Sequence, residues 1–170
     1  MIHDDHPFQT PPGERDPVRQ FRGRLTAPVT VVTAGGPGSE VGLTVSSLMV
    51  AEGDPGSVIV LIGSGTELWD AIGESGGRFI VHILDESMRD DADTFATIRP
   101  RPGGMFTGVD IEHTDWGPAL ADAPNRAYCT MTTFDALPFH YLVRADIDQI
   151  TIADLTAPAI YFRGTYRKLD

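Results

Sequence analysis

The distribution of apolar residues along the chain predicts a mainly β protein. The apolar runs are short, rich in β-branched residues and bounded by glycine and proline, which is typical of strands separated by turns. The stretch 57–62 is apolar on both faces, so we expect it to be buried on both sides of a sheet. The predicted strands cover residues 29–34, 41–49, 57–62, 79–84, 126–134, 140–152 and 158–168.

Helical periodicity is confined to short segments. Residues 18–27 indicate a short helix or turn. Ser64 and Glu67 fit a capping box, so we expect a helix with Ser64 at its N-cap and Gly76-Gly77 at its end. A further helix is predicted over 86–97, where apolar residues recur at helical spacing.

The order of these elements favours a barrel over a layered α/β fold. About seven strands accompany two or three helices, and they cluster early and late without regular βαβ alternation. A small, closed or partly closed antiparallel barrel of six to eight strands with peripheral helices fits this order. Residues 1–17 are polar and rich in proline, so we expect a flexible N-terminal arm, followed by one domain over 18–170.

Charge and composition narrow the possible partners. The net charge is −11, with 24 acidic against 13 basic residues and no basic cluster in the sequence, which disfavours nucleic acids and anionic membranes. A small anionic cofactor stays compatible, because a few backbone N–H groups can hold a phosphate locally. The single cysteine, Cys129, allows no intrachain disulfide, and we expect it to be buried. No apolar signal segment or 18-residue apolar run occurs, so we expect a cytoplasmic protein.

The candidate chemistry lies in small hydroxyl residues and glycines next to strands. Thr44, Ser46 and Ser47 lie in the second predicted strand, and Ser64-Gly65-Thr66 follows the third. Such residues let a planar, phosphorylated ligand lie against the backbone, although helix capping alone would also explain Ser64 and Thr66. The histidines lack the spacing of a zinc site and cysteine partners, so we expect no metal.

The order of several motifs resembles the flavin reductase-like family. The segments similar to that family's pattern are Pro28–Thr33, Gly42-Leu43-Thr44-Val45-Ser46-Ser47-Leu48, Ser64-Gly65-Thr66, Phe79–Leu84, Phe95-Ala96, His140 and Ala159–Tyr166. Two departures are His82, where the family pattern has asparagine, and Pro138-Phe139 before His140, where it has Gly-Asp.

The resemblance implies an FMN-binding split β-barrel that acts as an NAD(P)H:flavin oxidoreductase, like the small reductase of a two-component monooxygenase. It implies His140 as the residue on the nicotinamide side, and FMN or FAD as cofactor with NADH or NADPH as hydride donor. The implied cofactor contacts are Thr44, Val45, Ser46, Ser47, Ser64, Gly65, Thr66, His82, Phe95 and Arg163. His82 as a core residue and Arg163 in an interface salt bridge are alternatives.

The resemblance also implies a homodimer, with Ile160, Phe162 and Trp116 as candidate buried surface, and a flavin-dependent monooxygenase as a partner that receives flavin. Two other functions stay open on the same fold. One is a flavin- or haem-binding protein without catalysis, which the altered Pro138-Phe139 pair favours. The other is a reductase that uses a deazaflavin.

Overall fold

The computed structural model describes residues 16–169, so most of the predicted N-terminal arm lies outside the described residues. The helices are α1 (Pro17–Arg22), α2 (Glu67–Glu74) and α3 (Arg89–Phe95), with a 3-10 turn at Glu86–Met88. The strands are β1 (Ala27–Pro28), β2 (Thr30–Ala34), β3 (Val41–Val45), β4 (Leu48–Ala51), β5 (Ser57–Gly63), β6 (Arg78–Ile83), β7 (Ile111–Thr114), β8 (Gly117–Leu120), β9 (Arg126–Ala136), β10 (His140–Thr151), β11 (Ile160–Phe162) and β12 (Thr165–Arg167). No helix in this part of the chain is long and apolar enough to cross a bilayer.

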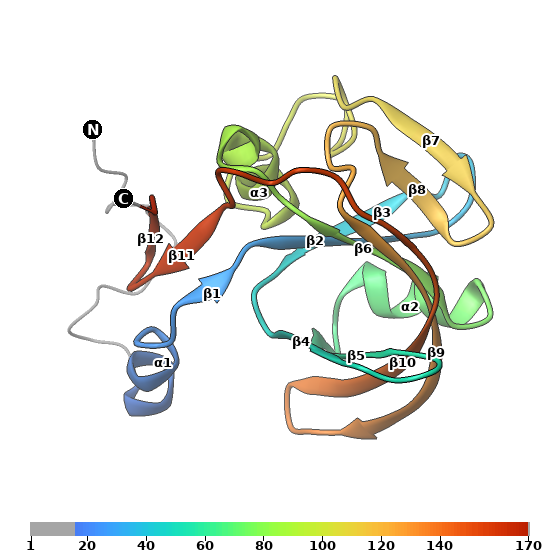
Figure 1. Ribbon diagram of the computed structural model, residues 1–170, viewed down its shortest axis with the longest axis horizontal. Helices are drawn as coiled ribbons and strands as arrows, with labels where there is room; N and C mark the ends of the chain where they lie inside the picture. Colours follow the sequence, from blue (N-terminus) through green and yellow to red (C-terminus); the bar gives the residue numbers. More distant parts are fainter. Residues whose placement is uncertain (1–15, 170) are drawn as a thin grey trace.

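One curled antiparallel sheet forms the body of the molecule. Its seven strands follow the order β3-β2-β6-β9-β10-β5-β4, and every neighbouring pair is antiparallel. β3 and β4 are the two edges of this sheet, yet only Ser46 and Ser47 separate them in the chain. The sheet therefore has to curl until its edges approach each other, as Figure 1 shows. We call the Ser46-Ser47 link between the two edges the seam.

The long hairpin of β9 and β10 carries much of the curvature. Its register shifts between Arg144 and Ala145 and again between Ile147 and Gln149. Such bulges bend a strand and increase its twist, which helps a sheet to close on itself. The expected mainly β fold with antiparallel strands and peripheral helices is confirmed.

Two apolar cores lie on opposite sides of β2. Val32 and Ala34 face the inside of the curled sheet, where the buried face of α2 also packs. Val31 faces a second cluster that includes Phe95 of α3. Because a core covers each face, β2 is buried at every position.

The prediction that 57–62 is buried on both faces is wrong. In β5 buried and half-buried residues alternate, and Leu61 on the half-buried face borders a cavity. β5 therefore has a core on one face only, and its other face borders the cavity. The predicted burial on both faces belongs to β2 instead.

Several predicted element boundaries also change. The single strand expected over 41–49 is broken at the seam, where the chain passes from one sheet edge to the other. The strand expected over 158–168 is a hairpin, β11–β12, that turns at Arg163-Gly164. Residues 111–120 form the hairpin β7–β8, which was not predicted. Pro17, expected at the end of the arm, is the first residue of α1, and Asp16 caps it.

Candidate functional site

A cavity of about 420 Å³ lies between the seam and the elements at the two ends of the described chain. Its volume falls in the range of about 300–1,000 Å³ that is usual for small-molecule sites. The seam side contributes Thr44, Ser46, Ser47 and Leu61. The opposite side consists of α1, β1 and the β11–β12 hairpin, which form a separate layer at the left of Figure 1. The lining combines apolar and aromatic residues with a few polar groups, as small-molecule sites usually do.

The seam presents hydrogen-bonding groups that the fold does not use. Within residues 16–169, neither the amide N–H groups of Ser46 and Ser47 nor the Ser46 hydroxyl makes a hydrogen bond. The Ser47 hydroxyl donates to the Leu61 carbonyl at 3.1 Å, and the Leu61 amide donates to the Ser47 carbonyl at 3.4 Å, so the link is held in place. Thr44 donates its hydroxyl to the Ala92 carbonyl of α3 at 2.6 Å and keeps only acceptor capacity. Two fixed and unpaired amides can hold the polar edge of a planar ligand.

Four of the implied cofactor contacts therefore come together at this cavity: Thr44, Ser46, Ser47 and Arg163. Arg163 stands at the tip of β11–β12, and its amide donates to the Gly23 carbonyl just after α1 at 3.0 Å. Arg19 and Arg22 of α1 also line the cavity and were not predicted. Their spacing of three residues in a short helix was the available signal, since it places them on one face.

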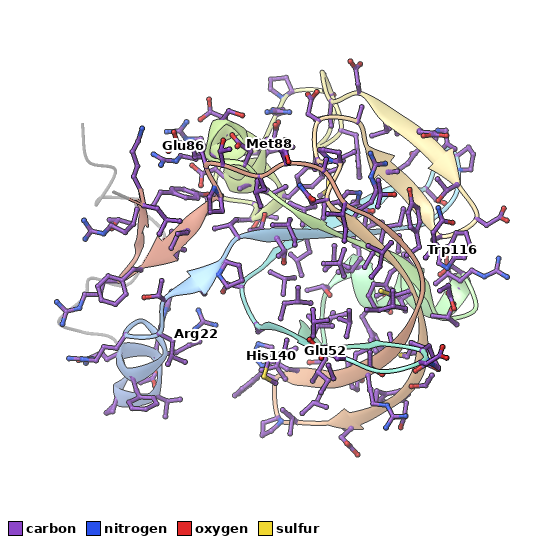
Figure 2. All side chains as sticks on the ribbon, viewed as in Figure 1. Arg22, Glu52, Glu86, Met88, Trp116 and His140 are labelled. Carbon is purple, nitrogen blue, oxygen red and sulfur yellow. The ribbon has the colours of Figure 1, made fainter. Side chains whose placement is uncertain are left out.

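The loop Ser64-Gly65-Thr66 and His140 form a second group beside the cavity. The Ser64 amide donates to the Phe139 carbonyl at 3.1 Å, and His140 is paired with Gly63 across β10 and β5. Gly63 lies two residues beyond Leu61 on the same face of β5, about 7 Å further along the strand. Figure 2 shows His140 at the end of β10 that is nearer to α1, and Arg22 on the α1 side.

Thr66, and not Ser64, is the N-cap of α2. Its hydroxyl donates to the Gly63 carbonyl at 2.8 Å and accepts from the Trp69 amide at 3.4 Å. The capping box expected from Ser64 and Glu67 is therefore wrong, because the turn at Ser64-Gly65 delays the helix by two residues. Ser64 and Gly65 are exposed, which leaves this loop open to a ligand.

Three implied contacts lie away from the cavity, and the clearest is His82. It is completely buried, its Nδ1 lies 3.1 Å from the Val31 carbonyl, and its Nε2 accepts from the Leu120 amide at 3.1 Å. Burial lowers the pKa of His82 from 6.5 to about 3, so the ring is neutral and the Nδ1 proton goes to Val31. These contacts favour the alternative of a core histidine, and His82 does not line the cavity.

Phe95 and Val45 are also placed in the core. The Phe95 ring is fully buried and packs against Gly42, where an added Cβ would lie 2.6 Å from the ring. The glycine of the motif thus permits the close approach of α3 to β3. Val45 is buried, and its carbonyl accepts from the Thr30 hydroxyl at 2.6 Å. Neither Phe95 nor Val45 lines the cavity, so both stay predicted contacts that this site does not explain.

Tyr166 and Asp93 form a polar pair in the cavity wall. The Tyr166 hydroxyl donates to the Asp93 carboxylate at 2.8 Å, and burial together with this carboxylate raises the pKa of Tyr166. Asp93 also lies 3.7 Å from the guanidinium of Arg99. The negative charge of Asp93 is therefore balanced inside the protein, and Tyr166 stays protonated.

A second cavity, of about 390 Å³, is a poorer candidate for an anionic cofactor. It lies near the 3-10 turn, and four of its lining residues are aspartates. Only Asp91 among them has a cationic partner within residues 16–169, the guanidinium of Arg101 at 2.6 Å. Phosphate groups would be repelled there, so the cavity at the seam is the better candidate.

Known proteins with related sequences show the family of the domain. The family model "Flavin reductase like domain" matches residues 22–170. The reductase component of 4-nitrophenol 4-monooxygenase/4-nitrocatechol 2-monooxygenase from Rhodococcus opacus is 30% identical over 158 residues, which cover 91% of this chain and 81% of that protein. The NADH-dependent FMN reductase AsuE2 from Streptomyces nodosus subsp. asukaensis is 30% identical over 163 residues, covering 94% of this chain and 87% of the relative.

A solved structure gives the same result for the fold. The crystal structure of nitrilotriacetate monooxygenase component B from Mycobacterium thermoresistibile superimposes with a TM-score of 0.78 at 26% identity, over 90% of this chain and 87% of that one. The matched family, the relatives and the antiparallel barrel with its seam lead to one conclusion: the chain belongs to the flavin reductase-like family.

Proposed function

We propose that this protein is an NAD(P)H-dependent flavin reductase that holds FMN, or FAD, in the cavity at the seam. The observation that carries the proposal is the pair of unpaired amides at Ser46 and Ser47, fixed in the wall of a cavity with cationic side chains at its rim. The relatives from Rhodococcus and Streptomyces are named as a reductase component and an NADH-dependent FMN reductase, which supports the same activity here.

The donor groups of the cavity fit a flavin. The seam amides and the Ser46 hydroxyl can hydrogen-bond to the carbonyl and nitrogen atoms at the pyrimidine edge of the ring. Leu61, Tyr161 and Tyr166 offer apolar and aromatic surface for a flat ring system. The exposed loop Ser64-Gly65-Thr66 is our candidate for the flavin phosphate. Bound flavin and nicotinamide would supply the hydride chemistry, and the protein would supply binding and orientation.

His140 is our candidate for the residue that positions the nicotinamide. It is half-buried at the start of β10, beside the turn at Gly63-Ser64. A ring nitrogen there can hydrogen-bond to the nicotinamide carboxamide and fix its orientation. The preceding Phe139 is 78% exposed, so its ring extends away from the domain and leaves the surface near His140 free.

We further infer a homodimer and a cytoplasmic location, with a flavin-dependent monooxygenase as the partner that receives reduced flavin. Large apolar side chains are exposed on both sides of the cavity: Phe21 and Val18 on α1, and Met49 and Val50 on the edge strand β4. Such surface is suited to burial against a second copy of the chain. Light scattering at micromolar concentration is expected to give twice the monomer mass, and a monomer would contradict the dimer.

Anaerobic mixing of the FMN-loaded protein with NADH and then with NADPH tests the function. We expect the flavin absorption to bleach with at least one of them, and His140→Ala to slow bleaching while leaving FMN affinity nearly unchanged. FMN binding without bleaching by either donor would reject the reductase and favour a non-catalytic flavin carrier. A Soret band in the purified protein would favour haem, and reduction of a deazaflavin but not of FMN would favour the third function.

A further inference from the structure

Three arginines meet at the rim of the cavity from opposite ends of the described chain. Arg19 and Arg22 lie one turn apart on α1, and Arg163 lies at the tip of the β11–β12 hairpin. The bond from the Arg163 amide to the Gly23 carbonyl, at 3.0 Å, joins the hairpin to the end of α1. All three residues line the same cavity, and Figure 2 labels Arg22 at α1, to the left of the barrel.

This concentration of positive charge is unusual for this protein. The chain has only 13 basic residues against 24 acidic ones. The ion pairs found within residues 16–169 involve other side chains, and none includes Arg19, Arg22 or Arg163. Both arginines stand in the last turn of α1, where a positive charge suits the helix dipole, but like charges three residues apart on a helix also repel each other. An anion between them would remove that repulsion.

The backbone at Arg163 gives a second, independent indication. Arg163 has φ +53° and Gly164 has φ +85°, the arrangement of a tight hairpin turn in which both central residues are left-handed. Asparagine or glycine adopts the first of these positions readily, whereas a long side chain is strained there. Strained residues of this kind are concentrated at functional sites. In this strained conformation the Arg163 guanidinium lies over the Phe162 ring, with its central carbon 5.6 Å from the ring centroid.

The nearest carboxylate on the cavity does not cancel this charge. Asp93 is engaged by the Tyr166 hydroxyl at 2.8 Å and lies 3.7 Å from Arg99. The arginines are on the wall of α1 and β11–β12, whereas the candidate loop for the flavin phosphate, Ser64–Thr66, lies beyond Leu61 on the other wall. If the flavin phosphate occupies that loop, as proposed above, the arginines are left for an anion that FMN lacks.

We propose that Arg19, Arg22 and Arg163 form a binding site for the diphosphate of a dinucleotide. The proposal rests on the proposed function and adds the substrate group that this rim selects. Arginine suits the role because its planar fork binds two phosphate oxygens at once. FAD and NAD(P)H both contain such a diphosphate, and the two sources are separated by the test.

Binding measurements on the full chain test the site without any turnover. The variants are Arg19→Gln/Arg22→Gln and Arg163→Asn, with Arg24→Gln as the matched control. Arg24 carries the same charge next to α1, but its guanidinium donates to the Gln20 carbonyl at 2.9 Å and does not line the cavity. Dissociation constants are measured for FMN and FAD by flavin fluorescence, and for ADP-ribose by calorimetry on FMN-loaded protein.

We expect each site variant to weaken FAD, ADP-ribose or both by roughly ten- to a hundredfold, and by at least tenfold more than FMN. The Arg24→Gln protein keeps the wild-type constants. Weakening of FAD alone identifies the flavin dinucleotide as the ligand, and weakening of ADP-ribose alone identifies the nicotinamide dinucleotide. Arg163→Asn is also expected to melt at the wild-type temperature or above, because asparagine tolerates the left-handed turn.

Three results would overturn the proposal. The first is equal weakening of FMN and FAD binding, which would assign the arginines to the FMN phosphate. The others are unchanged dissociation constants in both site variants, and no binding of FAD and ADP-ribose by the wild type at millimolar concentration. A wild-type protein that binds these ligands but does not bleach FMN with NADH or NADPH would instead reject the proposed function and leave the anion site intact.

Discussion

The polar residues buried in β2 and β6, at the centre of the molecule between its two cores, are similar in type to those at the seam, but only the seam leaves hydrogen-bonding groups that the fold does not use. Thr30, Thr33 and His82 are fully buried, and each makes a hydrogen bond to a backbone group of a neighbouring segment. Ser46 and Ser47 lie on a cavity with free amides. Polar groups at the centre therefore specify the fold, and polar groups at the seam are available to a ligand.

The largest expected effect is at the centre. His82→Leu removes the partner of the buried Leu120 amide and one hydrogen bond to the Val31 carbonyl. A buried unpaired group costs about 1–3 kcal/mol, so we expect the free energy of unfolding to fall by at least that much in urea titrations. FMN affinity of the folded protein should be nearly unchanged. His113→Leu, on the exposed β7 hairpin strand, is the matched control and should change stability by less than about 0.5 kcal/mol.

The lowered pKa of His82 also predicts how the free energy of unfolding depends on pH. The pKa of His82 is about 3 in the folded protein against 6.5 ordinarily, so between these values the unfolded chain binds a proton that the folded chain does not. Above pH 6.5 the neutral ring makes its full contribution to the free energy of unfolding. This contribution decreases as the pH falls toward 3, by up to about 1.4 kcal/mol per pH unit. Urea titrations of the wild type and of His82→Gln at pH 7, 5.5 and 4.5 measure the difference. Parallel pH profiles for the two proteins would contradict the assignment.

At the seam the expected effect is on the ligand. Ser46→Pro removes an amide N–H that the fold does not use, so stability should hardly change, whereas FMN affinity should fall by roughly ten- to a hundredfold. Ser46→Ala keeps the amide and loses only the hydroxyl, and it should have the smaller effect in the same fluorescence titration. Equal affinities in all three proteins would mean that this amide does not contact the flavin.

The smallest effect separates capping from phosphate binding. Thr66→Ala removes the N-cap of α2 and should lower stability by about 1 kcal/mol, whereas Ser64→Ala should not change it measurably. Both variants should weaken FMN more than riboflavin, which lacks the phosphate. If both ligands weaken equally, the loop does not hold the phosphate.

Local sequence patterns predicted most strands, because the alternation of apolar and polar residues and the content of β-branched residues are properties of each strand's own sequence. They did not predict β7–β8, where the strands are short and the second one contains Pro118, a residue that is unfavourable in strands. They also placed the cap at Ser64 when Thr66 has the same chemistry two residues later, since the choice depends on backbone angles that the turn imposes.

The site was predicted only in part, because a cavity is a property of the packed chain. The motif around Thr44, Ser46 and Ser47 is contiguous and was found from the sequence. Phe95 and His82 occur in other segments that resemble the family pattern, but both side chains are fully buried away from the cavity. The rim joins Arg22 to Arg163, and no sequence pattern connects residues so far apart.

The layer opposite the seam has one more consequence, which concerns local unfolding. α1 has no buried residue, and β1, β11 and β12 form a separate sheet of two- and three-residue strands. Segments with so little buried surface open far below the global free energy of unfolding. A ligand that bridges this layer to the barrel at a hundred times its dissociation constant would stabilise the closed form by about 2.7 kcal/mol. Amide exchange and protease cleavage near Phe21 and Tyr166 should therefore slow sharply when a ligand fills the cavity. The rates at these two segments then measure the fraction of the protein that has ligand bound.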